Sequence, residues 1–177
     1  DLPDLASLMR GEKKHEWLSE PRFEKMFSEI EDGLQGVLGK GTYDWVDRRV
    51  FDAVFDKSTL MSLHKLMQNG EIETLDYPIA IGKEADFFHG TSNHGPVAVK
   101  IIHTTNAVFK GLAKYIDGDP RFGGLSRRHR ELVNIWVRKE FRNLKRMRKY
   151  GLRVPKPLSN LKNVLIMEYL GEGEGVS

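Results

Sequence analysis

The spacing of apolar residues changes near Ile72, and this change limits the fold more than any other feature of the sequence. Before it, apolar residues recur every three or four positions, which is the period of one face of a helix. After it, apolar residues alternate or run together in short segments between turn formers, which is typical of strands. One long helical segment interrupts the strands at residues 131–150. We therefore expect helices first, followed by strands and one long helix.

Two helices are expected before the change. The first has an apolar face made of Phe23, Met26, Phe27 and Ile30, within a polar stretch that we interpret as an appendage. Apolar residues also recur at helical spacing between Trp45 and Phe55. The second helix has Asp56 or Ser58 as N-cap and Gly70 as terminator, and its apolar stripe is Leu60, Leu63, Leu66 and Met67. The helical segment at residues 45–55 and the helix that follows it could form a helix-turn-helix, although no basic recognition helix follows them.

Strands and a long helix are expected after residue 72. A β-hairpin is predicted first, with one strand through Ile79 to Phe88, another at residues 97–102, and a loop of turn formers at 90–96. Residues 103–130 have no steady period and are expected to form a long loop. The helix at 131–150 has a buried stripe of Val133, Trp136, Val137, Leu144 and Met147. Two more strands are expected at 154–158 and 164–170, before a glycine-rich tail.

Composition excludes several kinds of site and indicates one kind of partner. The 177 residues contain no cysteine, which excludes disulfides, thiolate zinc sites and cysteine nucleophiles. No run of about 18 apolar residues exists, so no membrane-spanning helix is expected. Residues 101–150 hold thirteen Lys/Arg against four Asp/Glu. This basic region indicates an anionic partner such as phosphate, nucleotide or RNA, and the alternative is a solvated helix face.

Two charged residues fall at positions where the pattern predicts burial. Alternation in residues 97–102 places Lys100 on one strand face with Ala98 and Ile102. Glu140 lies on the apolar stripe of the long helix, four residues after Trp136. Because an unpaired buried charge is costly, each requires a partner of opposite charge, and we expect the two to pair. The alternatives are a lysine that snorkels from an edge strand and a glutamate that meets solvent.

A glycine turn precedes the Lys100 strand. Gly82 and Lys83 lie where a strand begins, and the backbone N–H groups of such a turn can bind phosphate. The turn matches neither G-x-x-x-x-G-K-[ST] nor G-x-G-x-x-G. By itself it is explained better as an ordinary turn.

Together these segments resemble the RIO family of atypical serine/threonine protein kinases, most closely its type-one branch. The resemblance covers about residues 56–171, and its motifs are Gly82-Lys83-Glu84-Ala85-Asp86, Ala98-Val99-Lys100-Ile101, Lys139-Glu140-Phe141-Arg142-Asn143-Leu144 and Val164-Leu165-Ile166-Met167-Glu168-Tyr169-Leu170-Gly171. It implies an α+β fold, the N-terminal lobe of a protein-kinase-like protein. Such a lobe has a twisted five-stranded antiparallel sheet with one long helix, here preceded by short helices.

The resemblance also implies a domain division. Residues 1–75 would form a helical extension, and residues 76–171 would form the small lobe with a flexible loop at about 103–130. Residues 172–177 would be a tail that leads to a C-terminal lobe absent from this chain.

The same resemblance implies a nucleotide site. Lys100 would hold the α- and β-phosphates of ATP, and Glu140 would pair with Lys100 and orient it. Gly82 and Lys83 would lie in the phosphate-covering loop, and Ala98 would leave room for the adenine ring. The backbone of the hinge would meet the adenine. The implied cofactor-binding residues are Gly82, Lys83, Ala98, Lys100, Glu140, Met167, Glu168 and Leu170.

The chain departs from the family pattern in two ways. Ala80 and Ile81 stand where family members usually have Ser and Thr, so the chain lacks those hydroxyl groups. The family's catalytic aspartate and its Mg²⁺ ligands belong to the C-terminal lobe. No catalytic or metal-binding residue is therefore expected in these 177 residues, and alone they are expected not to turn over ATP.

Three functions stay open on the sequence. The first is a RIO-type kinase or ATPase that uses Mg-ATP in the cytoplasm for small ribosomal subunit maturation, with the pre-ribosomal small subunit or its RNA as partner. The second is a noncatalytic RNA- or ribosome-binding module that uses residues 43–70 and the basic region 101–150. The third is a noncatalytic interaction domain with the same fold. No membrane partner is expected, and the sequence does not set an oligomeric state.

Overall fold

The computed structural model describes residues 20–37, 55–104 and 125–171 of the chain. In chain order its elements are α2 (Pro21–Ile30), the 3-10 helix η2 (Asp32–Leu34), α4 (Lys57–Gln68), β1 (Thr74–Ile81), β2 (Ala85–Ser92), β3 (Gly95–Ile102), α6 (Leu125–Lys149), β4 (Pro157–Leu161) and β5 (Val164–Glu168). The helix expected between residues 45 and 54, most of the loop expected at 103–130 and the tail 172–177 lie outside the described residues.

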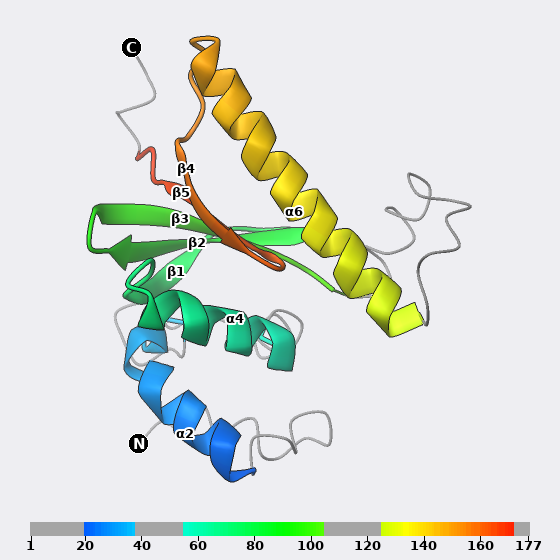
Figure 1. Ribbon diagram of the computed structural model, residues 1–177. Helices are drawn as coiled ribbons and strands as arrows, with labels where there is room; N and C mark the ends of the chain where they lie inside the picture. Colours follow the sequence, from blue (N-terminus) through cyan, green and yellow to red (C-terminus); the bar gives the residue numbers. More distant parts are fainter. Residues whose placement is uncertain (1–19, 38–54, 105–124, 172–177) are drawn as a thin grey trace.

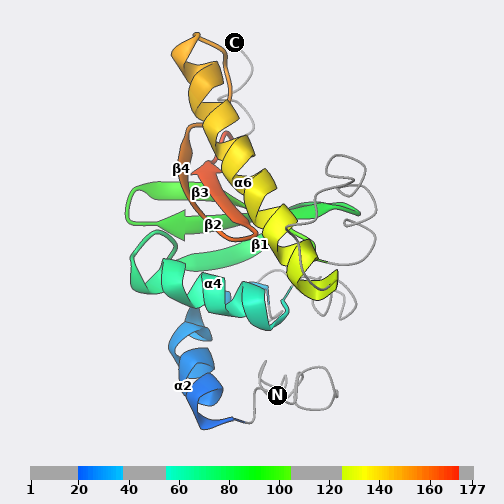
Figure 2. The ribbon, with the colours of Figure 1, turned by 45° about the vertical axis from the view of Figure 1, so that its right-hand side comes forward.

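The five strands form one antiparallel sheet in the order β1-β2-β3-β5-β4. The sheet is twisted, with α6 across one face and α4 against the other, and α2 lies beyond α4 (Figures 1 and 2). The expected α+β fold, a five-stranded antiparallel sheet with one long helix preceded by short helices, is therefore confirmed.

The sheet separates two hydrophobic cores because successive residues of a strand point to opposite faces. Val97, Val99 and Ile101 of β3 face α2 and α4, while Ala98 and Ile102 face α6. The four apolar residues predicted on one face of α2 are all buried in the first of these cores. The segment interpreted as an appendage thus shares a core with the sheet. The division of the chain at residues 75 and 76 stays a prediction.

The ends of α4 follow the signals in the sequence. Asp56 is the N-cap, since its backbone is extended and its Oδ1 accepts a hydrogen bond from the Thr59 N–H at 2.8 Å. The helix ends before Gly70, which has φ +75°, a conformation that glycine adopts without strain. The same Asp56 uses Oδ2 to accept a 2.7 Å hydrogen bond from the Thr104 hydroxyl, which joins α4 to the end of β3.

The predicted hairpin loop was too long. β2 continues to Ser92 and β3 starts at Gly95, so only Asn93 and His94 form the turn. Gly95, with φ +108°, lets the chain enter β3 directly after this turn. The turn formers at positions 90–92 and 95–96 therefore belong to the ladder between the two strands.

Two further boundaries were wrong. α6 begins at Leu125, so residues 125–130 of the predicted loop are helical; no glycine or proline follows Gly124 there, and arginine favours helices. β4 runs from Pro157 to Leu161 rather than over 154–158, because its polar residues occupy the edge strand. β5 ends at Glu168, two residues before the predicted end.

The predicted stripe of α6 was right for Val133 and Val137, which are buried, and wrong for Met147, which is 37% exposed. The last turns of α6 run past the sheet (Figure 1), so they have no core to enter. Leu132, which the stripe omitted, is buried instead.

Candidate nucleotide site

Lys100 and Glu140 form an ion pair between the sheet and the long helix. Lys100 lies on β3, which pairs with β2 on one side and β5 on the other, so it is not on an edge strand. Its Nζ lies 2.7 Å from Oε1 of Glu140, and the two side chains are 15% and 27% exposed. The predicted pairing is confirmed, whereas the binding of a nucleotide by the pair stays a prediction.

The surroundings of the pair favour a bound anion. The Lys100 ammonium lies 5.3 Å from the centroid of the Phe87 ring, a cation–π distance. Among the described residues its only hydrogen bond goes to Glu140, which leaves two of its three N–H donors free. The other carboxylate oxygen, Oε2 of Glu140, is buried without a hydrogen bond to a described residue. The pair thus keeps unused hydrogen-bonding capacity next to a partly exposed cation.

Ala98 and Met167 lie on the same face of the sheet as Lys100. They are direct partners in the ladder between β3 and β5, and both belong to the core that faces α6. Ala98 is 8% exposed and Met167 is 5% exposed. A methyl group at Ala98 leaves more space on this face than a larger side chain would, as a flat aromatic ligand requires.

The segment after β5 carries the predicted hinge residues. Oε1 of Glu168 accepts hydrogen bonds from the Lys156 N–H at 2.9 Å and from Arg148 Nη1 at 3.2 Å. The Glu168 N–H donates to the Lys156 carbonyl. Leu170 is 38% exposed, and its N–H makes no hydrogen bond to another described residue. Oε1 of Glu168 therefore joins the end of β5 to Lys156 and Arg148, and the binding of adenine by this segment stays a prediction.

Gly82 and Lys83 form the exposed turn between β1 and β2. The Gly82 N–H already donates a 3.0 Å hydrogen bond to Oδ1 of Asp86, so it is not free to bind phosphate. A Cβ at Gly82 would lie 3.0 Å from the Ala85 carbonyl oxygen, which explains why a glycine suits this position. Any phosphate contact of the turn is left to the groups that follow Gly82.

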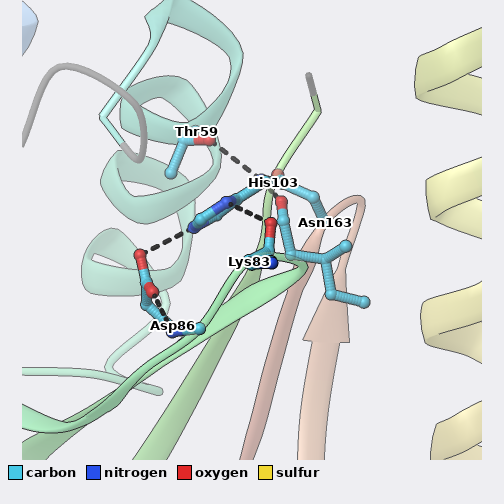
Figure 3. Close-up of polar contacts among 7 residues, drawn as sticks. Thr59, Lys83, Asp86, His103 and Asn163 are labelled. Carbon is cyan, nitrogen blue, oxygen red and sulfur yellow. Dashed lines mark hydrogen bonds and ion pairs between the residues drawn. The ribbon is translucent and has the colours of Figure 1, made fainter. Parts of the chain in front are cut away.

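The sequence analysis did not single out the residues that hold this turn. Asp86 is fully buried, and its Oδ2 lies 2.7 Å from Nε2 of His103 (Figure 3). The hydrogen bond to Asp86 raises the pKa of His103 above its ordinary value. The alternation that buries Phe88 also predicts burial of Asp86, two residues earlier on the same strand face, and this signal could have found it.

Ala80, at the position of a family hydroxyl residue, pairs with Phe87 across β1 and β2. It is exposed on the side of the sheet that carries Lys100. The methyl side chain of Ala80 offers no hydrogen bond to a ligand on this face.

Residues 20–37, 55–104 and 125–171 contain no group of three or more His, Asp or Glu side chains arranged to hold a metal ion. In the same described segments, no helix has the length and the apolar character needed to cross a membrane.

The sequence model of the RIO domain matches residues 86–177, more than half of the chain. The chain belongs to the RIO family. RIO-type serine/threonine-protein kinase Rio1 of Haloferax volcanii is 41% identical over 124 residues, which cover 70% of this chain and 43% of the relative. Serine/threonine-protein kinase RIO1 of Saccharomyces cerevisiae is 32% identical over an alignment of 201 residues, which covers 99% of this chain and 41% of the relative.

Among solved structures, the Rio2 kinase from Chaetomium thermophilum aligns with a TM-score of 0.49 and 20% identity, covering 62% of this chain and 32% of that chain. This RIO chain spans less than half the length of the Haloferax and Saccharomyces relatives that it matches.

Proposed function

We propose that this RIO chain supplies the ATP-binding lobe of an atypical serine/threonine kinase or ATPase. The observation that carries the proposal is the ion pair of Lys100 and Glu140, held between a central strand and the long helix, in which two lysine N–H donors have no partner among the described residues. Relatives from Haloferax volcanii and Saccharomyces cerevisiae bear the name serine/threonine-protein kinase, which supports phosphoryl transfer as the activity.

The residues would divide the binding of ATP as follows. Lys100 would donate hydrogen bonds to the α- and β-phosphates, while Glu140 holds the ammonium in place. Ala98 and Met167 would bound the adenine site, and the backbone of Glu168 and Leu170 would bind the adenine edge. Lys83, in the exposed turn after Gly82, would add positive charge near the phosphates.

Mg-ATP would supply the phosphoryl group, and the metal would neutralise charge as that group moves. The residues of this chain would bind and orient the nucleotide. The catalytic aspartate and the metal ligands would come from a second lobe. The wider proposal is a cytoplasmic role in small ribosomal subunit maturation, either by phosphorylation of a protein or by ATP hydrolysis.

Calorimetric titration with Mg-ATP tests the proposal in the full-length product of the gene that encodes this chain. Lys100→Ala should reduce binding at least a hundredfold, because it removes the cation that holds two phosphates. Lys65→Ala is the matched control: Lys65 is exposed on α4, on the opposite side of the sheet. Absence of binding in the wild type, or equal binding in the Lys100→Ala variant, would contradict the proposal.

A second function, RNA or ribosome binding, is supported by one surface of α6. Arg142, Arg146 and Lys149 are exposed and recur at intervals of four and three residues, which places them on one helix face. Because these residues lie away from the Lys100 pair, both functions can reside in one protein.

A further inference from the structure

The turn at residues 82–84 is exposed to solvent. The side chains that contact its backbone, Asp86 and His103, lie on the opposite face of the sheet from Lys100. Asp86 pairs with Ile101 across β2 and β3, and Ile101 belongs to the core that faces α4. His103 lies two residues after Ile101 along the chain and therefore extends from the same side. Neither side chain can touch a nucleotide bound at Lys100, so any effect on binding must pass through the turn.

Asp86 connects the start of the turn to His103. Its side chain is 0% exposed and its two oxygens have separate partners. Oδ1 accepts a hydrogen bond from the Gly82 N–H at 3.0 Å, and Oδ2 lies 2.7 Å from Nε2 of His103. A buried carboxylate is stable only with such partners, because burial without them would be costly.

His103 connects Asp86 to the middle of the turn. Nδ1 of its ring lies 3.1 Å from the Lys83 carbonyl oxygen (Figure 3). The His103 backbone N–H donates to the Glu84 carbonyl at 2.8 Å. The two ring nitrogens therefore face a carboxylate and a carbonyl, which only accept hydrogen bonds. Both contacts are satisfied only when both nitrogens carry hydrogen, that is, when the ring is an imidazolium.

The surroundings of His103 are fixed on its other sides. Its side chain is 10% exposed. Thr104, the next residue, donates to Asp56 at the N-terminus of α4. Near the ring, the charged residues of the described contacts are Asp86 on β2, Lys83 and Glu84 in the turn, and Asp56, the N-cap of α4. Of these, the Asp86 carboxylate contacts the ring, whereas Lys83 and Glu84 contact His103 through their backbone carbonyl oxygens. The Asp56 carboxylate accepts hydrogen bonds from Thr59 and Thr104 instead.

We propose that Asp86 and His103 are positioning residues that fix the phosphate-binding turn at residues 82–84, and that protonation of His103 controls how firmly the turn is held. This inference rests on the proposed function, since it concerns the same nucleotide site. Loss of the ring proton from Nδ1 removes the hydrogen bond to the Lys83 carbonyl and leaves two lone pairs facing each other. Of these contacts, the turn then keeps the hydrogen bond of Gly82 to Asp86 and that of the His103 backbone N–H to the Glu84 carbonyl, and its affinity for phosphate falls.

Nitrogen NMR of the ¹⁵N-labelled full-length protein, without nucleotide, tests the positioning role directly. Between about pH 5.5 and about pH 8.5, the amide signals of Lys83 and Glu84 should titrate with the same midpoint as the His103 ring nitrogens. The His103→Gln variant should lack this titration. His64→Gln is the matched control, because His64 contacts Glu29 at 2.6 Å and lies on α4, outside the turn. A His103 ring pKa that is not raised above its ordinary value, or turn amides that do not follow the ring, would overturn the inference.

Mg-ATP affinity over the same pH range completes the test. Wild-type affinity relative to that of His103→Gln should fall about threefold to tenfold as pH rises, the equivalent of one hydrogen bond. Because ATP titrates in the same way with both proteins, its effect on affinity cancels in this ratio. The affinity of the His64→Gln control should change with pH as that of the wild type does. Binding that depends on Lys100 but has the same pH profile in wild type and His103→Gln would overturn the inference and leave the proposed function intact. Absence of Lys100-dependent binding would overturn the proposed function and the link to phosphate affinity, while the NMR titration still decides whether His103 positions the turn.

Discussion

At the scale of single residues, the ion pair of Lys100 and Glu140 joins two largely buried charges that are 40 positions apart in the sequence. Each charge lies on a largely apolar face, and its attraction to the other charge offsets the cost of removing both from water. The pair leaves Oε2 of Glu140 buried and without a hydrogen bond to a described residue. A fold selected for stability alone would gain from apolar residues at both positions, so the pair indicates function.

Glu140→Gln should show how much the negative charge of Glu140, as distinct from the shape of its side chain, contributes to stability and to Mg-ATP affinity. The amide fills the same volume but leaves the Lys100 ammonium without its counter-charge, and we expect a loss of about 2 kcal/mol in the free energy of unfolding. Urea unfolding measures this loss, and Glu73→Gln, at an exposed position, is the control. Mg-ATP affinity should fall as well, because the lysine is no longer held. Unchanged stability together with unchanged affinity would contradict this prediction.

His103 should make stability depend on pH in a definite direction. Its pKa in the folded protein is raised, chiefly by the hydrogen bond to Asp86, above the value of about 6.5 that it has in the unfolded chain. The folded state therefore binds the proton more tightly. The resulting stabilisation is complete below the unfolded pKa and is lost as pH rises through the folded pKa.

Urea midpoints of the wild type and of His103→Gln, measured at a series of pH values, check this direction. The advantage of the wild type should shrink as pH rises through the raised pKa. An advantage that is constant, or that grows with pH, would mean that the fold does not raise the pKa of His103.

At the scale of elements, the packing of η2 against β1 depends on a residue without a side chain. A Cβ placed on Gly36, just after η2, would clash with the backbone carbonyl of Asp76 on β1. Because a Cβ and a carbonyl oxygen are both fixed by the backbone, neither can rotate away. Gly36→Ala should therefore cost about 1–3 kcal/mol, in the range of overpacked cores.

Thermal unfolding followed by circular dichroism measures this cost. Ser28→Ala, at an exposed position on α2, should change the midpoint little. Equal midpoints for Gly36→Ala and the wild type would show that η2 can shift away from β1 without loss.

The elements also show what the sequence could and could not predict. The period of apolar residues located α2 and α4, and the capping chemistry of Asp56 and Gly70 located the ends of α4, because these signals act over a few residues. The pairing of Lys100 with Glu140 was predictable because each charge was conspicuous on an apolar face. The contact of Asp86 with His103 was not, since it depends on which residues face each other across β2 and β3 and on where β3 ends. Sequence periodicity alone does not determine that register.

At the scale of the whole molecule, the basic surface of α6 is separate from the proposed nucleotide site. α6 contacts the sheet through its apolar side, and its last turns extend past the sheet (Figure 2). Arg148 near this end contacts Glu168 at 3.2 Å, while Arg142, Arg146 and Lys149 remain exposed. A polyanion could bind along this surface without covering the site at Lys100.

Replacing Arg142, Arg146 and Lys149 together by Gln should weaken RNA binding and leave Mg-ATP binding unchanged. The slope of log affinity against log salt concentration should fall by about 2 to 3, because each basic residue that contacts a phosphate releases about one counterion. Fluorescence anisotropy with a labelled single-stranded RNA measures both quantities, and Lys65→Gln on α4 is the control. An unchanged salt slope would remove this surface from the proposal of RNA binding.

Lys100 on β3 and His103, directly after the end of β3, belong to the two halves of the proposed site, and the interval between them matters. Lys100 and His103 are separated by three positions, an odd number, so they project from opposite faces of the sheet. Inserting or deleting one residue between them would bring both cations to the same face and would remove either the partner of Glu140 or the partner of Asp86. Substitutions along this stretch can be tolerated one at a time, whereas its length has to be conserved if the protein is to keep both contacts.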